Sequence, residues 1–468
     1  MNKSKVIGFI TAVMLSAILV SVVAGQPVQS TSSTLPADVP WVMETIDASS
    51  GDIVGQHNSI VFSTETGKAY ISYYDAANSE LRLTYPSASD GNCGPNHSWH
   101  CEVMDTSGDV GQDSAVDYYY DGSTETWKIG ISYYDATNRA LKVVVWTCGS
   151  TFCVGDTSTI QTGGSFSSTG RNTSLKFDST GVIHISYQKL STISDEVLMY
   201  AHSVSSGGNC GEGTAVGKWQ CDSVTSDPDV GRHTSLSVAA NDSIWIASFD
   251  SSFGSTGTGV VQICRLISNS WYCTDIDYVD GGFPALTVDG NNHAYLAYYD
   301  AANGDLNMAE YVGTGANANC GYNSILLQDE YRCEIIDDNI GSNINPMGID
   351  LAVGTGGYPL IAYEDASDLS GISVLNIARP IDAYGQISGN CGPQVGILHQ
   401  WQCDTLDNAT SGGGGGYLYE ADYLSTDINA DGLAFVSYYE YDDYNSEGRL
   451  KVVYQQQSIT VFLPIIIK

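Results

Sequence analysis

Six short segments of the chain share a glycine at the second position, and the polar side chains that follow this glycine in five of them are the first candidates for chemistry. The segments begin at Val54, Val110, Thr169, Val230, Asp280 and Ile340. The candidate binding residues that follow the glycines are Gln56, His57, Gln112, Asp113, Arg171, Asn172, Arg232, His233 and Asn343. Because glycine permits a close backbone approach, we expect these residues to surround the mouth of a shared funnel and to bind a ligand there.

Arg171 and Arg232 stand out among these candidates because they occupy equivalent places in consecutive segments. Cations are scarce in the chain, which has Lys+Arg 18 against Asp+Glu 53. Two neighbouring guanidinium groups could hold a carboxylate through charge-assisted hydrogen bonds. The alternative is that each arginine pairs with a nearby acid such as Asp227 or Asp229. Likewise, His57 and His233 could be acid–base groups or simply hydrogen-bonded rim residues.

A second candidate chemistry comes from acids that follow a repeated aromatic segment, because two carboxylates can hydrolyse a glycoside. These acids are Asp75, Asp135, Asp250, Asp300, Asp365 and Glu440. A residue that recurs in nearly every copy of a repeat suits a structural role better, and an aspartate at this place can bond the backbone N–H groups of a turn. The catalytic residues, if the protein has any, therefore stay unknown.

A third candidate is a calcium site at Asp427, Asn429 and Asp431. The segment from Asp427 to Gly432 is similar to the opening of an Asp-x-Asn-x-Asp-Gly calcium loop. The twelfth position holds Tyr438 where such a loop has glutamate, so a plain hairpin turn is the alternative. Apart from this Ca²⁺ candidate, the sequence calls for no cofactor.

The elements that must position these residues are given by an internal repeat. A β-branched and aromatic segment recurs seven times, at Ala69–Asp75, Ile129–Asp135, Ile183–Tyr187, Ile244–Asp250, Ala294–Asp300, Pro359–Asp365 and Ala434–Glu440. Turn residues precede each copy and further short apolar runs follow it, so each unit resolves into four strands. Four-stranded units repeated around an axis predict an all-β fold, a seven-bladed β-propeller.

The two ends of the repeat predict how the ring closes. Trp41–Asp47 reads as a fourth strand that stands alone at the start, whereas the last unit stops after its third strand near Tyr454. We therefore expect the N-terminal strand to complete the C-terminal blade.

Twelve cysteines fall into six close pairs, which predict six disulfides, each within one blade. The expected pairs are Cys93 with Cys101, Cys148 with Cys153, Cys210 with Cys221, Cys264 with Cys273, Cys320 with Cys333 and Cys391 with Cys403. In an exported chain such spacing is typical of disulfides. Zinc is the rival interpretation, but no Cys-x-x-Cys knuckle is present.

The loop Ser89–Gly94, which ends in Trp99, resembles the Asp-box, or BNR-type repeat, of sialidase-like β-propellers. Ser206–Gly211 and Ser388–Gly392 resemble it more loosely. The full Ser-x-Asp-x-Gly-x-x-Trp spacing is never intact, and the Arg-Ile-Pro motif of that family is absent. The resemblance implies kinship of fold. Because the Asp-box is structural in that family, it carries over no catalytic residue.

The ends of the chain predict export. Lys3 and Lys5 precede an apolar run and small residues, as in a secretory signal peptide over residues 1–25. We expect a Pro/Ser/Thr-rich linker over 26–40, the propeller over 41–457 and a short apolar tail over 458–468, which is either a sorting signal or a docked strand. A retained membrane anchor is the alternative to cleavage. After cleavage we expect no membrane span and a secreted protein, extracellular or at the cell surface.

The net charge of −35 makes nucleic acid and anionic lipid unsuitable partners. These observations favour a secreted, non-catalytic binding propeller that recognises a glycan or cell-surface polymer through its central funnel. A sialidase-like glycoside hydrolase is one alternative. An extracellular scaffold or adhesion protein with a protein partner is the other.

Overall fold

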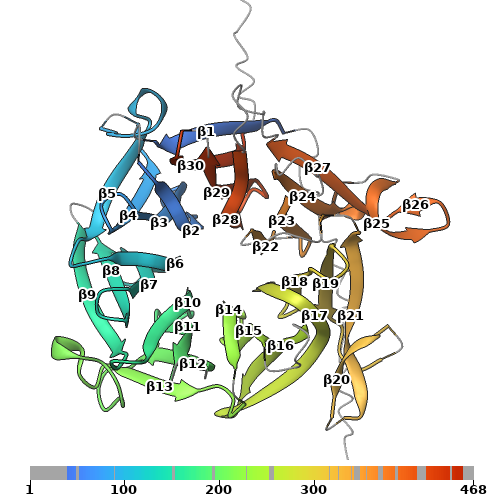
Figure 1. The fold of residues 1–468 in the computed structure, drawn as a ribbon, viewed down its shortest axis with the longest axis horizontal. Helices are drawn as coiled ribbons and strands as arrows, with labels where there is room; N and C mark the ends of the chain where they lie inside the picture. Colours follow the sequence, from blue (N-terminus) through green and yellow to red (C-terminus); the bar gives the residue numbers. More distant parts are fainter. Residues whose placement is uncertain are drawn as a thin grey trace, which may run out of the picture. The chain divides into compact units, whose positions relative to one another are not determined.

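A ring of seven antiparallel sheets surrounds a central axis (Figure 1), as the computed structural model of the chain shows. The structure describes residues 39–48, 52–88, 90–149, 153–191, 196–227, 229–251, 258–315, 317–324, 326–338, 340–341, 348–354, 356–366, 373–384, 388–407, 418–442 and 445–456. The predicted seven-bladed β-propeller is therefore confirmed. The predicted signal peptide, most of the linker and the apolar tail lie outside the described residues.

Each blade contains four strands in sequence order from the axis outward, and the first three blades follow this pattern without additions. Blade 1 contains β2 (Val54–Ser63), β3 (Lys68–Asp75), β4 (Glu80–Pro86) and β5 (Trp99–Asp105). Blade 2 contains β6 (Val110–Asp121), β7 (Thr126–Asp135), β8 (Ala140–Cys148) and β9 (Cys153–Thr162). Blade 3 contains β10 (Ser168–Phe177), β11 (Ile183–Leu190), β12 (Glu196–Ser203) and β13 (Trp219–Ser223).

Blades 4 to 6 add a shared strand and two outer extensions to the same plan. Blade 4 contains β14 (Val230–Val238), β15 (Ile244–Asp250), β16 (Thr258–Ile267) and the first half of β17 (Ser270–Val288). Blade 5 contains the second half of β17, then β18 (Ala294–Asp300), β19 (Asp305–Tyr311) and β21 (Gln328–Asp337), with β20 (Cys320–Asn323) at its edge. Blade 6 contains β22 (Ile349–Val353), β23 (Pro359–Asp365), β24 (Val374–Pro380) and β27 (Trp401–Asp407), extended by β25 (Gly389–Val395) and β26 (Leu398–His399).

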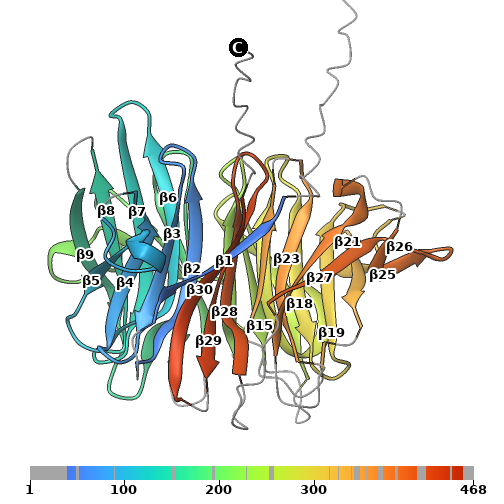
Figure 2. The same cartoon turned by 90° about the horizontal axis from the view of Figure 1, so that it is seen from above.

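Blade 7 closes the ring as the sequence predicts. It contains β28 (Leu418–Ile428), β29 (Ala434–Asp442), β30 (Glu447–Gln455) and, as its outer strand, β1 (Trp41–Asp47). The N-terminal strand runs antiparallel to β30, from the pair of Trp41 with Gln455 onward. In the side view the inner strands run along the ring axis, whereas outer strands such as β1 and β27 cross it obliquely (Figure 2).

A tyrosine hydrogen bond joins neighbouring blades at six of the seven boundaries that the described residues form. In each case the tyrosine at the fifth position of the repeat is buried, and its hydroxyl donates to a residue at or near the end of the fourth-strand segment of the preceding blade. The donor and acceptor pairs, 2.5 to 3.0 Å apart, are Tyr73 and Asp47, Tyr133 and Asp105, Tyr187 and Gln161, Tyr298 and Asp277, Tyr363 and Asp337, and Tyr438 and Asp407.

The boundary between blades 3 and 4 departs from this rule. Ser248 occupies the tyrosine position on β15, and its buried hydroxyl has no hydrogen-bond partner among the described residues. Thr225 stands where the other blades place the acceptor. At this boundary, smaller residues thus occupy both the position of the tyrosine donor and that of its acceptor.

The six predicted disulfides are all confirmed, and each joins the two cysteines of one blade. In blades 2 and 4 the partners face each other across a hairpin, with Cα atoms 4.0 and 3.9 Å apart. In the other four blades the first cysteine lies ahead of the fourth strand, and the Cα atoms are 5.9 to 6.0 Å apart. The observed bonds are Cys93 to Cys101, Cys148 to Cys153, Cys210 to Cys221, Cys264 to Cys273, Cys320 to Cys333 and Cys391 to Cys403.

Three short 3-10 turns, η1 (Pro95–His97), η2 (Gly213–Ala215) and η3 (Ile381–Tyr384), complete the described secondary structure. None of the described helices has the length and apolar character needed to cross a membrane.

Candidate functional site

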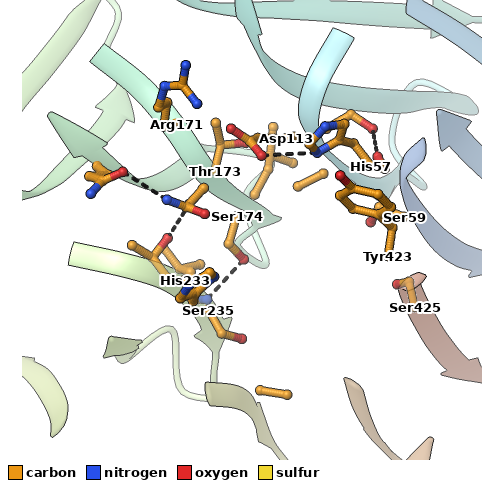
Figure 3. A pocket seen from close by; sticks show the side chains of 18 of the residues that line it. His57, Ser59, Asp113, Arg171, Thr173, Ser174, His233, Ser235, Tyr423 and Ser425 are labelled. Carbon is orange, nitrogen blue, oxygen red and sulfur yellow. Dashed lines mark hydrogen bonds and ion pairs between the residues drawn. The ribbon is translucent and has the colours of Figure 1, made fainter. Parts of the chain in front are cut away.

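The starts of the inner strands surround an open cavity of about 1070 Å³ on the ring axis (Figure 3). Residues from blades 1 to 7 line it, so the strand links that the sequence singled out do converge. Of the predicted binding residues, the cavity lining includes His57, Gln112, Asp113, Arg171, Asn172, Arg232 and His233. Gln56 is half-buried and is not part of the lining, and Asn343 lies outside the described residues.

Backbone geometry explains why a glycine precedes these residues. Gly55 has a φ of 100°, and a Cβ atom at this position would approach the backbone of Leu450 to 2.7 Å. At the second residue after the glycine, the backbone adopts a left-handed conformation, which residues other than glycine rarely adopt. The residues at this position form what we call the inner ring: His57, Asp113, Asn172, His233, Phe283 and Tyr423, with φ between 48° and 52°.

Hydrogen bonds between blades hold the inner ring in this conformation. The hydroxyl of Ser114 donates to the carbonyl oxygen of His57 at 2.7 Å, and Thr234 donates to that of Asn172 at the same distance. Thr173 donates to the carbonyl of Asp113 at 3.2 Å. Because blades 2, 3 and 4 each fix the inner-ring residue of the preceding blade, this part of the cavity is preorganised for binding.

His57 and Asp113 form the first pair of the inner ring. His57 Nδ1 lies 3.1 Å from Asp113 Oδ1, and the imidazole packs against the Tyr423 ring at 4.3 Å between centroids. Burial raises the pKa of Asp113, but the bonds from His57 and from the Asn172 N–H, together with the charge of Arg171, lower it overall. The carboxylate therefore stays ionised and orients the imidazole.

His233 and Phe283 form the second pair, with ring centroids 4.1 Å apart. Burial lowers the pKa of His233 to about 4, against an opposing effect of Asp113, and the charge of Arg232 lowers it further. The imidazole is thus neutral at physiological pH. One of its nitrogens can donate a hydrogen bond and the other can accept one.

The two predicted arginines differ, contrary to the expectation that they act alike. Arg232 Nε donates to both carboxylate oxygens of Glu196, at 2.8 and 2.7 Å. Its partner is therefore neither Asp227 nor Asp229. Glu196 is buried while the Arg232 side chain is 47% exposed, so the arginine compensates a buried acid.

Arg171 is exposed, and its guanidinium lies over the Tyr134 ring at 4.7 Å from the centroid. No acid lies within ion-pair distance of Arg171 in the part of the chain that the structure describes. The other cations lining the cavity are engaged: Arg139 with backbone carbonyls, Lys176 with Asp117 and Arg232 with Glu196. Arg171 is thus the available anion-binding group of the funnel.

The remaining predicted residues support the ring. Gln112 Nε2 donates to the Asp109 carboxylate at 3.3 Å, and the same carboxylate accepts a bond from Tyr74 OH. Asn172 Nδ2 donates to Gln188 Oε1 at 2.9 Å. Both side chains therefore connect the rim to the second strand of a blade.

The cavity also has a charged cluster that the sequence patterns did not indicate, to which Lys176, Asp350 and Asp427 of the lining belong. Lys176 Nζ lies 3.7 Å from Asp117. Burial lowers the pKa of this lysine, but the charges of Asp117, Asp427 and Asp350 raise it overall. Burial also raises the pKa of Asp427 to about 6. The signal was available, because residues at alternate positions of an inner strand face the axis.

Two of the calcium candidates, Asp427 and Asn429, accept hydrogen bonds from backbone N–H groups. Asp427 Oδ2 accepts the Phe62 N–H of the next blade at 2.6 Å. Asn429 is buried in the hairpin turn, and its Oδ1 accepts the N–H groups of Asp431 and Leu433. Among the residues that the structure describes, no group of three or more His, Cys, Asp or Glu side chains is arranged to hold a metal ion. Nothing here adds support to the Ca²⁺ prediction.

Asp75, Asp135 and Asp300 have the turn role that was weighed against catalysis, whereas Glu440 forms ion pairs with Arg449 and Lys451. Asp75 Oδ1 accepts the Asn78 N–H and its Oδ2 accepts the Asn78 side chain. Asp135 makes the same two bonds with Asn138. These carboxylates belong to the loops that join the second and third strands.

Comparisons with known proteins identify no family for the chain. No protein-family model matches it, and no curated protein gives a significant match. Similar solved structures include a Hadza microbial sialidase (10% identity, TM-score 0.42, 86% of this chain and 65% of that chain) and the GH93 α-L-arabinofuranosidase of Fusarium graminearum (10%, 0.41, 68% and 92%). The β-propeller domain of the Trilobed protease from Pyrococcus furiosus is similar over 90% of this chain and 99% of that domain, with 8% identity and a TM-score of 0.41. The chain thus covers just under two thirds of the sialidase. These similarities concern the fold alone.

Proposed function

We propose that the protein is a secreted binding propeller whose funnel holds a carboxylate-bearing glycan or surface polymer. The observation that carries this proposal is Arg171, the one cation lining the described cavity that has no anionic or backbone partner. An exposed guanidinium beside an open, preorganised cavity suits a carboxylate ligand.

The rest of the lining supports a carbohydrate ligand. Hydroxyl, amide and imidazole groups of the inner ring present donors and acceptors, while Tyr423 and Phe283 present aromatic surface. Sugars combine hydroxyl groups with apolar faces, and such mixed surfaces bind them.

The hydrogen bonds and ion pairs of the acids at the cavity favour binding over hydrolysis. A hydrolase needs one carboxyl group as an acid and a second as a base or nucleophile. Asp113 is bonded to His57, Glu196 is bonded to Arg232, and Asp427 accepts a backbone N–H. Each acid has a structural partner, which leaves no evident pair for catalysis.

Export is part of the proposal, and six disulfides support it because such bonds persist in oxidising compartments. Expression of the full chain in its own cell type, with detection in the medium or on the cell surface, tests this point. Retention inside the cell would contradict it.

A glycan array that includes acidic and neutral carbohydrates tests the binding function. We expect acidic glycans to bind with affinities in the micromolar to millimolar range and to weaken with added salt, because the contact to Arg171 is ionic. Arg171→Ala should abolish binding without loss of stability, since the side chain is exposed, and Arg171→Lys should restore it in part. Exclusive binding of neutral glycans, or full binding by Arg171→Ala, would refute the proposal. Turnover of a chromogenic sialoside in the same assay would favour the hydrolase instead.

A further inference from the structure

Phe166 lies in the link between blades 2 and 3, where it lines the cavity although its side chain is 79% exposed. The link from Thr162 to Thr169 is eight residues long, whereas five residues, Thr106 to Val110, separate Asp105 from Gly111 at the preceding boundary. The extra length thus presents a large apolar ring to solvent at the mouth of the funnel. Such exposure is typical of a binding surface.

Hydrogen bonds hold this loop in one conformation. Gly163 N and Thr169 N both donate to the carbonyl oxygen of Arg139, at 2.9 and 3.2 Å. The Arg139 side chain donates to the carbonyl oxygens of Gly164 and Ser165. Because the loop is fixed at both its ends and its middle, Phe166 needs little ordering to meet a ligand, which favours affinity.

The size of the cavity bears on the length of the ligand. Pockets for a single drug-sized molecule measure about 300–1000 Å³, and this cavity of about 1070 Å³ is at the upper limit of that range. A lone sugar would leave much of it filled with water. An oligosaccharide that extends from the axis past Arg171 would reach the blade 2 to blade 3 link.

We propose that Phe166 forms an outer subsite that stacks on a second sugar unit of a linear, uronic-acid-containing polysaccharide, beyond the unit whose carboxylate binds Arg171. This proposal rests on the proposed function and names its ligand as a chain rather than a terminal sugar. Arg171 binds a carboxylate of the ligand, whatever the length of the oligosaccharide. Phe166 supplies the preference for longer chains.

Calorimetry with uronic-acid oligomers of increasing length tests the subsite. The probes are fragments of oligogalacturonate, alginate and hyaluronan, from the single sugar to the hexamer. We expect affinity to increase with length, and Phe166→Ala to weaken the longest fragment by roughly two- to tenfold, the effect of losing one aromatic stacking contact, while leaving the single sugar unaffected. Phe166→Tyr should keep the affinity of the native protein.

Two controls separate the possible failures. Val216→Ala removes an apolar side chain that is 67% exposed and lies outside the cavity lining, and it should change nothing. If no uronic-acid fragment binds but another acidic glycan does, the subsite is refuted and the proposed function stands; if no acidic glycan of any kind binds, the proposed function itself fails. If fragments bind through Arg171 but Phe166→Ala has no effect on any length, only the subsite is refuted. A change of oligomeric state in Phe166→Ala, with unchanged binding, would assign Phe166 to self-association and also refute it.

Discussion

Ser132 and Ser248 are both fully buried on the second strand of their blades, but only one of them has a partner. Ser132 Oγ lies 2.5 Å from Thr173 Oγ1 of the next blade, whereas Ser248 Oγ has no partner in the described chain. A buried hydroxyl without a hydrogen bond costs free energy, so removing it relieves that cost.

We therefore predict opposite effects of two alanine substitutions. Ser132→Ala should lower the free energy of unfolding by about 1 kcal/mol, whereas Ser248→Ala should leave it unchanged or raise it by up to about 1 kcal/mol. Urea unfolding followed by circular dichroism measures both. Equal destabilisation by the two variants would contradict the assigned hydrogen-bond states.

The lowered pKa of His233 predicts how the free energy of unfolding depends on pH. Its pKa in the folded protein is about 4, below the ordinary value of 6.5, so between these values the unfolded chain binds more protons. This histidine therefore destabilises the fold as pH falls from about 6.5 to about 4, by about 3 kcal/mol in total. Asp427, with its pKa raised to about 6, acts in the opposite direction because protonation favours the folded state.

Substitutions of His233 and Asp427 separate the contributions of these two residues to the pH dependence of stability. From near pH 7 to near pH 4, His233→Gln should lose less stability than the native protein, and Asp427→Asn should lose more. Denaturant unfolding at a series of pH values measures the difference. Superimposable pH profiles for all three proteins would contradict the burial of these groups.

At the scale of elements, β1 carries the closure of the ring. Besides its pairing with β30, β1 provides the acceptors for two bonds to blade 1: Tyr73 OH donates to Asp47 at 2.7 Å, and Trp99 Nε1 donates to Glu44 at 2.7 Å. Removal of this strand exposes the edge of β30 and breaks both contacts.

Deletion of Trp41–Asp47 should therefore lower the thermal midpoint sharply and make the protein prone to aggregation. Deletion of residues 26–38, which precede the strand, is the matched control and should leave the midpoint unchanged. Thermal melting followed by circular dichroism compares the two. A midpoint that survives the first deletion would show that the ring does not depend on its N-terminal strand.

The strands could be predicted from the sequence because the repeated residues make the same contact in successive blades. The buried Tyr133 and its acceptor Asp105 come from motifs that recur around the ring, and paired cysteines recur with them. The pairing of Arg232 with Glu196 could not be predicted, since Glu196 lies 36 residues earlier and has no counterpart in other blades. Side-chain directions after the glycines also depend on the left-handed residue that follows, which sequence alone did not reveal.

At the scale of the whole molecule, the backbone repeats seven times but the chemistry of the funnel does not. The available guanidinium of Arg171 and the exposed ring of Phe166 both lie on the side of blades 2 and 3. The pair of His57 with Asp113 comes from the adjoining blades 1 and 2 (Figure 3). The net charge of −35 repels most anions at long range. Selectivity for a carboxylate ligand must then come from direct contact with Arg171 rather than from the overall field.

A crystal structure of the protein with a uronic-acid hexamer tests the central claim most directly, because it locates the ligand without relying on a variant. We expect the oligosaccharide to lie in the axial funnel, with one carboxylate within hydrogen-bond distance of the Arg171 guanidinium. An oligosaccharide bound on the outer strands, with the funnel filled only by water, would contradict it.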